Sequence, residues 1–462
     1  MRLTRNIFLF LSFAFAIVIS LVAGGCAQIG MPDGGPKDTL APKLIRATPE
    51  NLSRNVTTNK ITLEFNEYID VQNLQQNLII SPLQNRNPTV IANPRSITLK
   101  FRDTLLPNTT YTVHFGDAIK DNNEGNVYRG LSYVFSTGNT IDSLSLSGKV
   151  ILAETGGTDT TVIVMIYRNA ADTTVLKKKP NYIAKVESDG SFLFSNLPPA
   201  SFKIYALKDG DGGKTYNSKS EIFAFADEEA STENNNPVTL YAYAEQKPPE
   251  NKITSPLRPG ADKKLRYTAS LQEKQDLFEP LEIVFNNPLK EKDRTKIYLT
   301  DTLFSKINGV RFSTDSTAKK IFLTTAWQAD KPLILIIEKG AVKDSAGNTL
   351  AKTDTLRFNT KGREEYGKLT LRFNDLDLSG NPVLQFLTGN EIKYSYALTG
   401  KEWTSNMFLP GQYGIRILYD SDKNGKWTPG NYEKKLQPEI AVTLPQKLNV
   451  RADWDNESEI NL

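Results

Sequence analysis

Cysteine and histidine are almost absent from the sequence. Its 462 residues hold one cysteine, Cys26, and one histidine, His114. Disulfide frameworks, multi-thiolate or multi-histidine zinc sites and thiol catalysis are therefore excluded. A Ser-His-Asp triad would have to use His114. That histidine lies in the alternating stretch Tyr111–Phe115, whose apolar side chains face the core, so we expect its imidazole to face water. We predict no catalytic residues and no organic cofactor.

Helical periodicity and a strong net charge are also lacking. After Cys26 the chain instead shows short runs in which apolar and polar residues alternate, such as Ile61–Phe65 and Ile97–Phe101. Such runs between turn signals predict the antiparallel strands of sandwiches or barrels, and hence an all-β fold. The formal net charge is +4, without a clustered basic face. This balance argues against a nucleic-acid partner.

The one long apolar stretch lies at the N-terminus. Arg2 and Arg5 precede the seventeen residues Ile7–Ala23, which are fewer than the about 20 that span a bilayer. A basic start, a short apolar stretch and then small residues are typical of a secretory signal. Gly24, Gly25 and Cys26 follow, and this layout resembles the lipobox of bacterial lipoproteins, although Ala23 stands where that motif usually has Leu.

The lipobox resemblance implies a lipid anchor. Residues 1–25 would be removed as a lipoprotein signal peptide, and Cys26 would carry a diacylglycerol and an acylated amine, with about 0.8 kcal/mol of membrane affinity per buried CH₂. Ala27, rather than Asp, follows the cysteine, which implies the outer membrane of a Gram-negative cell. Which side of that membrane the protein faces is left open. Ordinary signal cleavage with a spare thiol, and an uncleaved anchor, are the alternatives.

Two segments share the same landmarks at nearly the same spacing. The first has Phe65, a Tyr111 strand, the turn Lys120–Asn126 and Phe135; the second has Phe285, the turn Lys343–Asn348 and Phe358. These landmarks resemble the bacterial Ig-like domain first known from S-layer proteins, the SbsA-like family. The second copy lacks the acidic residue of the first motif and the strand tyrosine, so it is divergent. We interpret Asp121 and Asp344 as turn formers.

A second unit alternates with the first. Residues 195–216 parallel residues 407–427, and each copy opens with a strand that carries Gly, at Gly148 and Gly367. The phrase around Phe192, Phe194 and Leu197 resembles prealbumin-like or carboxypeptidase-regulatory-like sandwiches. The predicted order is a signal peptide (1–25), a flexible tether (26–42), an Ig-like domain A1 (43–143), a prealbumin-like sandwich B1 (144–245), a linker (246–261), a divergent Ig-like domain A2 (262–363) and a second prealbumin-like sandwich B2 (364–462).

One loop carries the spacing of a cation site. Asp420, Asp422 and Asn424 stand at i, i+2 and i+4, and Gly425 follows. A short loop can wrap oxygen ligands around Ca²⁺ in this way. Position twelve, where an EF-hand has Glu, is Asn431. The alternative is a tight hairpin held by bonds from side chains to the backbone.

These observations predict a non-enzymatic lipoprotein of the outer membrane. Its partners would be the membrane, through the anchor, and an unknown envelope protein or glycan, in a structural or binding role. The alternative is a carbohydrate-binding accessory lipoprotein or the scaffold of a secreted hydrolase. Aromatic side chains could stack on sugars in that case, although in all-β domains they more often belong to the core; the four tryptophans are Trp327, Trp403, Trp427 and Trp454.

Overall fold

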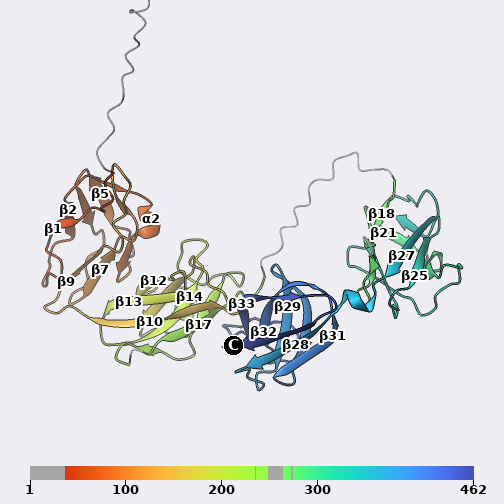
Figure 1. The fold of residues 1–462 in the computed structure, drawn as a ribbon. Helices are drawn as coiled ribbons and strands as arrows, with labels where there is room; N and C mark the ends of the chain where they lie inside the picture. The colour runs from red at the N-terminus through yellow and green to blue at the C-terminus, as the bar shows by residue number, and fades with distance from the viewer. Residues whose placement is uncertain (1–36, 235, 248–263, 272–273) are drawn as a thin grey trace, which may run out of the picture. The chain divides into compact units, whose positions relative to one another are not determined.

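The computed structural model describes residues 37–234, 236–247, 264–271 and 274–462. These residues form strands almost throughout, in several separate sheets (Figure 1). The all-β prediction is confirmed, and the described residues form tandem β-sandwich domains. The chain divides into two compact units, with Ser81–Leu83 and Asp142–Leu462 in one and the remaining residues in the other.

The region predicted as the Ig-like domain A1 builds a sandwich from one four-stranded sheet, one three-stranded sheet and a two-stranded ribbon. The sheet orders are β1-β2-β6-β5, β4-β7-β9 and β3-β8. Its aromatic core includes Tyr111, Phe135 and Phe101, with the Tyr111 and Phe135 rings stacked at 5.2 Å. Its elements are β1 (Leu44–Thr48), β2 (Lys60–Phe65), β3 (Ile69–Val71), α2 (Leu74–Asn77), β4 (Ile79–Ser81), β5 (Thr89–Asn93), β6 (Ser96–Lys100), β7 (Thr110–His114), β8 (Ile119–Asp121) and β9 (Ser132–Ser136).

Domain A2 repeats this topology. Its sheet orders are β18-β20-β24-β23, β19-β27-β25-β22 and β21-β26, which match those of A1 strand for strand apart from the added β19. Its elements are β18 (Tyr267–Ala269), β19 (Lys274–Gln275), β20 (Leu281–Phe285), β21 (Leu289–Lys292), η2 (Arg294–Lys296), β22 (Ile297–Thr300), β23 (Arg311–Thr314), β24 (Lys320–Thr324), β25 (Pro332–Ile337), β26 (Val342–Asp344) and β27 (Asp354–Thr360).

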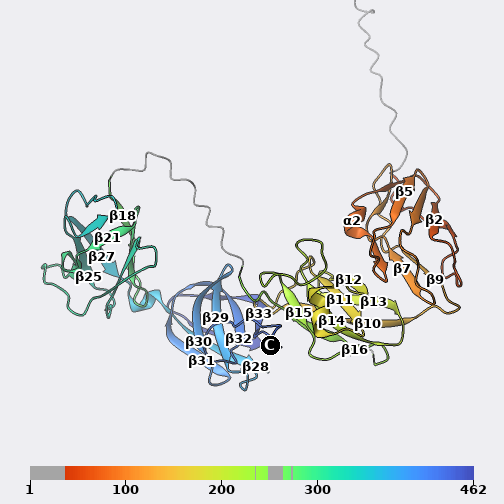
Figure 2. The same cartoon turned by 180° about the vertical axis from the view of Figure 1, so that it is seen from behind.

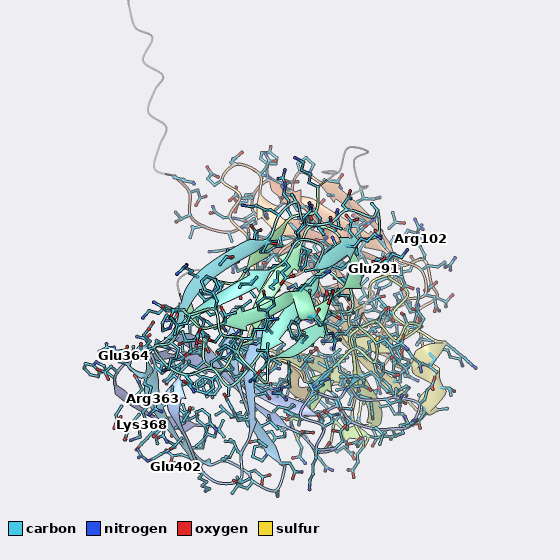
Figure 3. The ribbon with its side chains drawn as sticks, turned by 90° about the vertical axis from the view of Figure 1, so that its right-hand side faces the viewer. Arg102, Glu291, Arg363, Glu364, Lys368 and Glu402 are labelled. Atoms are coloured by element: carbon cyan, nitrogen blue, oxygen red, sulfur yellow. The ribbon has the colours of Figure 1, made fainter. Side chains whose placement is uncertain are left out.

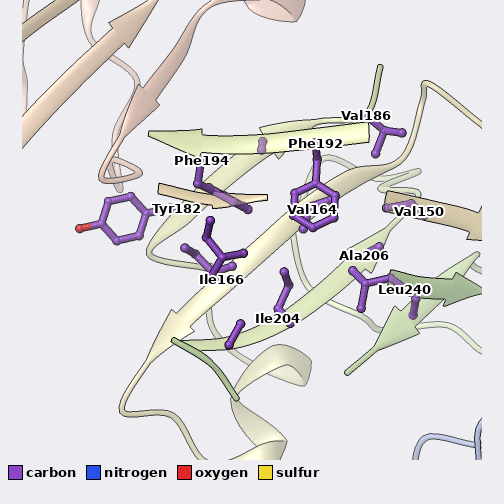
Figure 4. Packing of buried hydrophobic residues seen from close by; sticks show 14 of the residues in the cluster. Val150, Val164, Ile166, Tyr182, Val186, Phe192, Phe194, Ile204, Ala206 and Leu240 are labelled. Carbon is purple, nitrogen blue, oxygen red and sulfur yellow. The ribbon is translucent and has the colours of Figure 1, made fainter. Parts of the chain in front are cut away.

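Domain B1 is a sandwich of a three-stranded sheet, β13-β10-β17, and a sheet of order β12-β11-β14-β15 with β16 added to β14. Phe192, Phe194, Ile166 and Ile204 fill the space between the sheets (Figure 4). A side chain at Gly148 would place Cβ 1.9 Å from the Val238 carbonyl oxygen, so only glycine allows the β10–β17 pairing. Its elements are β10 (Leu144–Leu152), β11 (Ile163–Arg168), η1 (Asp172–Leu176), β12 (Tyr182–Lys185), β13 (Ser191–Leu197), β14 (Ser201–Leu207), β15 (Phe223–Phe225), β16 (Ala230–Ser231) and β17 (Val238–Ala242).

Domain B2 repeats the topology of B1, with sheet orders β31-β28-β34 and β30-β29-β32-β33. In both copies the first strand pairs parallel with the last. Figure 2 shows the strands of both sandwiches from behind. Its elements are η3 (Arg363–Glu365), β28 (Gly367–Asn374), β29 (Pro382–Thr388), β30 (Glu391–Ala397), β31 (Glu402–Phe408), β32 (Gly411–Tyr419), β33 (Ile440–Val450) and β34 (Asp455–Asn461).

Charged side chains cover the outer faces of the sheets. Glu291, Lys368 and Glu402 stand on the outside of their strands (Figure 3). On B2, Arg372 bridges two neighbouring strands, with its guanidinium 3.0 Å from Glu402 and 2.8 Å from Glu457. Such exposed ion pairs add at most about 1 kcal/mol each, so burial between the sheets holds the sandwiches together.

The two predicted turn formers sit at equivalent places in A1 and A2. The Asp121 carboxylate accepts hydrogen bonds from four backbone N–H groups, those of residues 123 to 126, at 2.5–3.0 Å. Asp344 accepts from the backbone N–H of Ala346 and Asn348, at 3.0 and 2.8 Å. Both side chains are buried. Each carboxylate therefore closes the turn that follows its strand, as their residue type suggests.

Candidate functional site

An acidic cluster lies in the loop between β32 and β33 of B2. Asp420 follows β32 and is 3% exposed, Glu439 precedes β33 and is 6% exposed, and Asp422 is exposed. One carboxylate oxygen from each lies within 4.8 Å of the others. The structure thus brings together two of the predicted ligands and adds Glu439. No spacing signal identifies Glu439 in the sequence, because the return of the chain at β33 places it there.

The third predicted ligand, Asn424, also braces the loop. Its amide nitrogen donates to Asp422 Oδ2 at 2.8 Å and to Thr428 Oγ1 at 2.9 Å. Its side-chain oxygen accepts from the backbone N–H of Lys426 at 2.6 Å. The Asn424 oxygen is thus engaged within its own turn, and the carboxylates are the groups that converge.

Backbone N–H groups hold the three carboxylates in place. Asp420 accepts from Asn424 N at 3.1 Å and from Gly425 N at 2.7 Å. Glu439 accepts from Ser421 N at 2.7 Å and, with its other oxygen, from Thr428 N at 2.9 Å. The Thr428 hydroxyl, the largest contributor, lowers the pKa of Asp422, which keeps that group charged at neutral pH.

The donor set fits a hard divalent cation. Carboxylate oxygens are preferred ligands of Ca²⁺, and six to eight oxygens usually surround that ion. Two unit charges 4.8 Å apart repel by roughly 3 kcal/mol at an effective dielectric of 20, so a bound cation would relieve repulsion within the cluster. The same hydrogen bonds also explain a hairpin without any ion, as the alternative interpretation requires.

The equivalent loop of B1 carries its own cation. Lys214 Nζ lies 3.8 Å from Asp209 Oδ2, and the Lys214 backbone N–H donates to Asp209 Oδ1 at 3.3 Å. Asp211 accepts from Gly213 N at 2.7 Å and from the Asn217 amide at 2.7 Å. An ammonium group therefore neutralises this loop from within, which leaves the B2 loop as the better cation candidate.

Three of the four tryptophans are partly buried and pack against hydrophobic clusters. Trp327 packs on the A2 core, Trp403 packs on the B2 core with its ring 5.4 Å from that of Phe386, and Trp427 donates from Nε1 to the Glu439 carbonyl at 2.7 Å. Trp454 is 60% exposed, with the Arg451 guanidinium 5.3 Å from its ring. Stacking on a sugar is therefore open to Trp454 and not to the packed faces of the others.

Two further positions singled out in the sequence are His114 and Cys26. His114 is half-buried rather than turned into water, because Thr110 and Thr112 on the same face of β7 are buried as well. Burial lowers the pKa of His114, so the imidazole is neutral at pH 7. Cys26, the predicted lipidation site, lies outside the described residues.

Comparison with protein families identifies part of the chain. Residues 38–137 match the model of the bacterial Ig-like domain. Domain A1 is similar to this family. This match covers A1 only, and no curated protein matches the chain. The Ig-like prediction for A1 is thereby confirmed, whereas the prealbumin-like assignment of B1 and B2 stays a prediction.

Solved structures with tandem domains resemble the chain weakly. They include native alpha-2-macroglobulin from Escherichia coli, domains MG0-NIE-MG1, with 15% identity over 40% of this chain and 73% of that chain and a TM-score of 0.21. The S-layer protein rSbsC(31-844) is 13% identical in sequence. That alignment covers 91% of this chain and 54% of that chain, with a TM-score of 0.17. BcpA, the major pilin subunit of Bacillus cereus, is 7% identical in sequence. That alignment covers 69% of this chain and 99% of that chain, with a TM-score of 0.16. Scores this low carry no argument about function.

Within residues 37–462, apart from the gaps named above, no helix has the length and apolarity needed to cross a bilayer.

Proposed function

We propose that the protein is a non-enzymatic lipoprotein of the outer membrane that carries Ig-like and related sandwiches in a structural or binding role at the cell envelope. The observation that carries the proposal is the lipobox-like Cys26 a short distance before a bacterial Ig-like domain, residues 38–137. Acyl chains at Cys26 hold the chain to the bilayer, and the sandwiches present their loops to an envelope protein or glycan.

The lipid anchor is tested by changing Cys26 to Ser. A serine keeps the size of the side chain but cannot form the thioether to diacylglycerol, so we expect the variant to leave the membrane fraction after cell lysis. The measurement is the distribution of the protein between membrane pellet and supernatant, with Ser20→Ala in the apolar stretch as the matched control. A Cys26→Ser variant that stays with the membrane as fully as the control contradicts the anchor.

The carbohydrate-binding alternative requires aromatic faces that are open to solvent. Trp403 and Trp427 are partly buried against hydrophobic clusters, which leaves less of their rings open to solvent than in Trp454. Trp454 keeps an open face. This alternative is favoured if the Trp454→Ala variant binds a polysaccharide more weakly than the wild type and the Trp403→Phe variant does not. We retain the envelope role as the proposed function.

We also propose that the cluster of Asp420, Asp422 and Glu439 binds Ca²⁺ and stiffens the β32–β33 loop. The convergence of three carboxylates within 4.8 Å supports this role. The ion would have a structural function, since the loop holds no group suited to activate a substrate and we predict no catalysis. Its test is a thermal melt with Ca²⁺ and with a chelator.

A further inference from the structure

The B2 segment between Trp427 and Gln437, here called the latch, reaches across to B1. Tyr432 stands at its centre and is 5% exposed. Its ring contacts an aromatic socket on β14 and β15 of B1 at centroid distances of 5.1–5.9 Å. The rings of the socket are Tyr205, Phe223 and Phe225. A tyrosine surrounded by rings in this way belongs to a core, although the rings come from two domains.

Hydrogen bonds from the hydroxyl and from the backbone N–H of Tyr432 hold the latch on B1. Its hydroxyl donates to the Asp172 carbonyl of B1 at 2.7 Å, and its backbone N–H donates to Glu245 Oε1 at 3.1 Å. Glu245 also accepts from the hydroxyl of Tyr216 at 3.1 Å. Further along, the Gln437 amide donates to the Phe225 carbonyl at 3.1 Å. Satisfied polar groups around a buried ring specify one docking geometry.

A second set of contacts continues the interface beyond the latch. The backbone N–H of Ala441 on β33 donates to the Ala153 carbonyl at 2.8 Å. The buried Arg416 donates from its guanidinium to the Glu154 carbonyl at 2.8 Å and to Gln385 Oε1 at 2.7 Å. Removing B1 would leave this guanidinium without one of these acceptors, which is costly for a buried charge.

The close approach of the two domains also depends on one glycine. A Cβ at Gly430 would lie 2.6 Å from Tyr243 Cζ, a distance that real Cβ atoms do not show. Tyr243 is buried in B1 beside the socket. The latch therefore has the residue type that its backbone position requires, in addition to the ring that fills the socket.

We propose that the latch locks B2 onto B1 within one chain, so that the two sandwiches act as a single module and A2 is an insertion within it. The lock uses residues 427–437 of B2 and the socket of B1. The acidic cluster sits at its root, since Asp422 binds the Thr428 hydroxyl at 2.8 Å and Glu439 binds the Trp427 indole through its carbonyl. The contacts from which the lock is inferred are separate from the proposed lipid anchor.

The test is to cut the folded chain between the two partners. A protease site inserted after Pro256, in the segment between B1 and A2, yields an A1–B1 half and an A2–B2 half. We expect the halves of the wild-type chain to co-elute in gel filtration at micromolar concentration. Because buried central aromatic residues dominate interfaces, Tyr432→Ala is expected to weaken their association by about 30-fold or more.

Two further variants separate the lock from general damage. Tyr432→Phe keeps the ring and loses the hydroxyl bond, so its loss of affinity is smaller than that of Tyr432→Ala. Trp454→Ala removes an exposed ring elsewhere on B2 and leaves the association unchanged. The proposal is overturned if the wild-type halves separate after cutting. It is also overturned if the two halves bind each other equally tightly in the Tyr432→Ala and Trp454→Ala variants.

Discussion

Single residues divide into those whose role follows from type and local spacing and those whose role needs the fold. Asp121 and Asp344 belong to the first kind, because Asp followed by Gly-Asn predicts a turn in which the carboxylate binds nearby N–H groups. Glu439 and Asn424 belong to the second. Asn424 has the spacing of a ligand, yet its amide braces the hairpin, and Glu439 reaches Asp420 only because β33 returns alongside β32.

The Asp121 turn makes a prediction about acid stability. Burial favours the neutral carboxyl, but the backbone N–H groups outweigh it and lower the pKa of Asp121 to about 2, below its usual value near 4. The bonded carboxylate therefore stabilises A1 above about pH 4, and this contribution is lost as the pH falls toward 2. We expect Asp121→Asn to lower the melting temperature of A1 by about 4 to 8 °C at pH 7 and by less at pH 2.

The measurement for Asp121 is calorimetry of the full chain at both pH values. Asp117→Asn, at an exposed position of the neighbouring turn, is the matched control. Equal melting temperatures for Asp121→Asn and wild type at pH 7 would show that the turn carboxylate does not stabilise the domain.

At the scale of elements, the alternating stretches predicted the strands well. Ile61–Phe65 lies in β2 and Ile97–Phe101 overlaps β6, and these two strands pair antiparallel. The repeated landmarks correspond to the matching sheet orders of A1 with A2 and of B1 with B2. His114 shows the limit of this reasoning. Alternation identifies the two faces of a strand, but what covers the second face depends on neighbouring segments that the local pattern does not reveal.

The β32–β33 loop makes a prediction about calcium. Millimolar Ca²⁺ is expected to raise the melting temperature of B2 by several degrees, because an ion that binds the folded state alone stabilises it by mass action. Asp420→Ala with Asp422→Ala abolishes this rise. Asp211→Ala in the Lys214-containing loop of B1 leaves it intact. Identical melts of the wild-type chain with Ca²⁺ and with a chelator would establish the hairpin without an ion.

At the scale of the whole molecule, the sequence indicates the alternation of two sandwich types but not which domains contact each other. Tyr432, Glu245 and Gly430 form no pattern that links B2 to B1, because residues far apart in the chain meet only after each sandwich has folded. The family match likewise covers A1 alone. The proposed role of the assembly therefore depends on its attachment to the membrane, and this attachment depends on Cys26.

Mass spectrometry of the mature N-terminus, purified from cell membranes, is the most direct test of that attachment. The account predicts a first peptide that begins at Cys26, lacks residues 1–25, and carries the added mass of a diacylglycerol and an amide-linked acyl chain. A peptide that begins at another residue, or one with an unmodified Cys26 thiol, would contradict it.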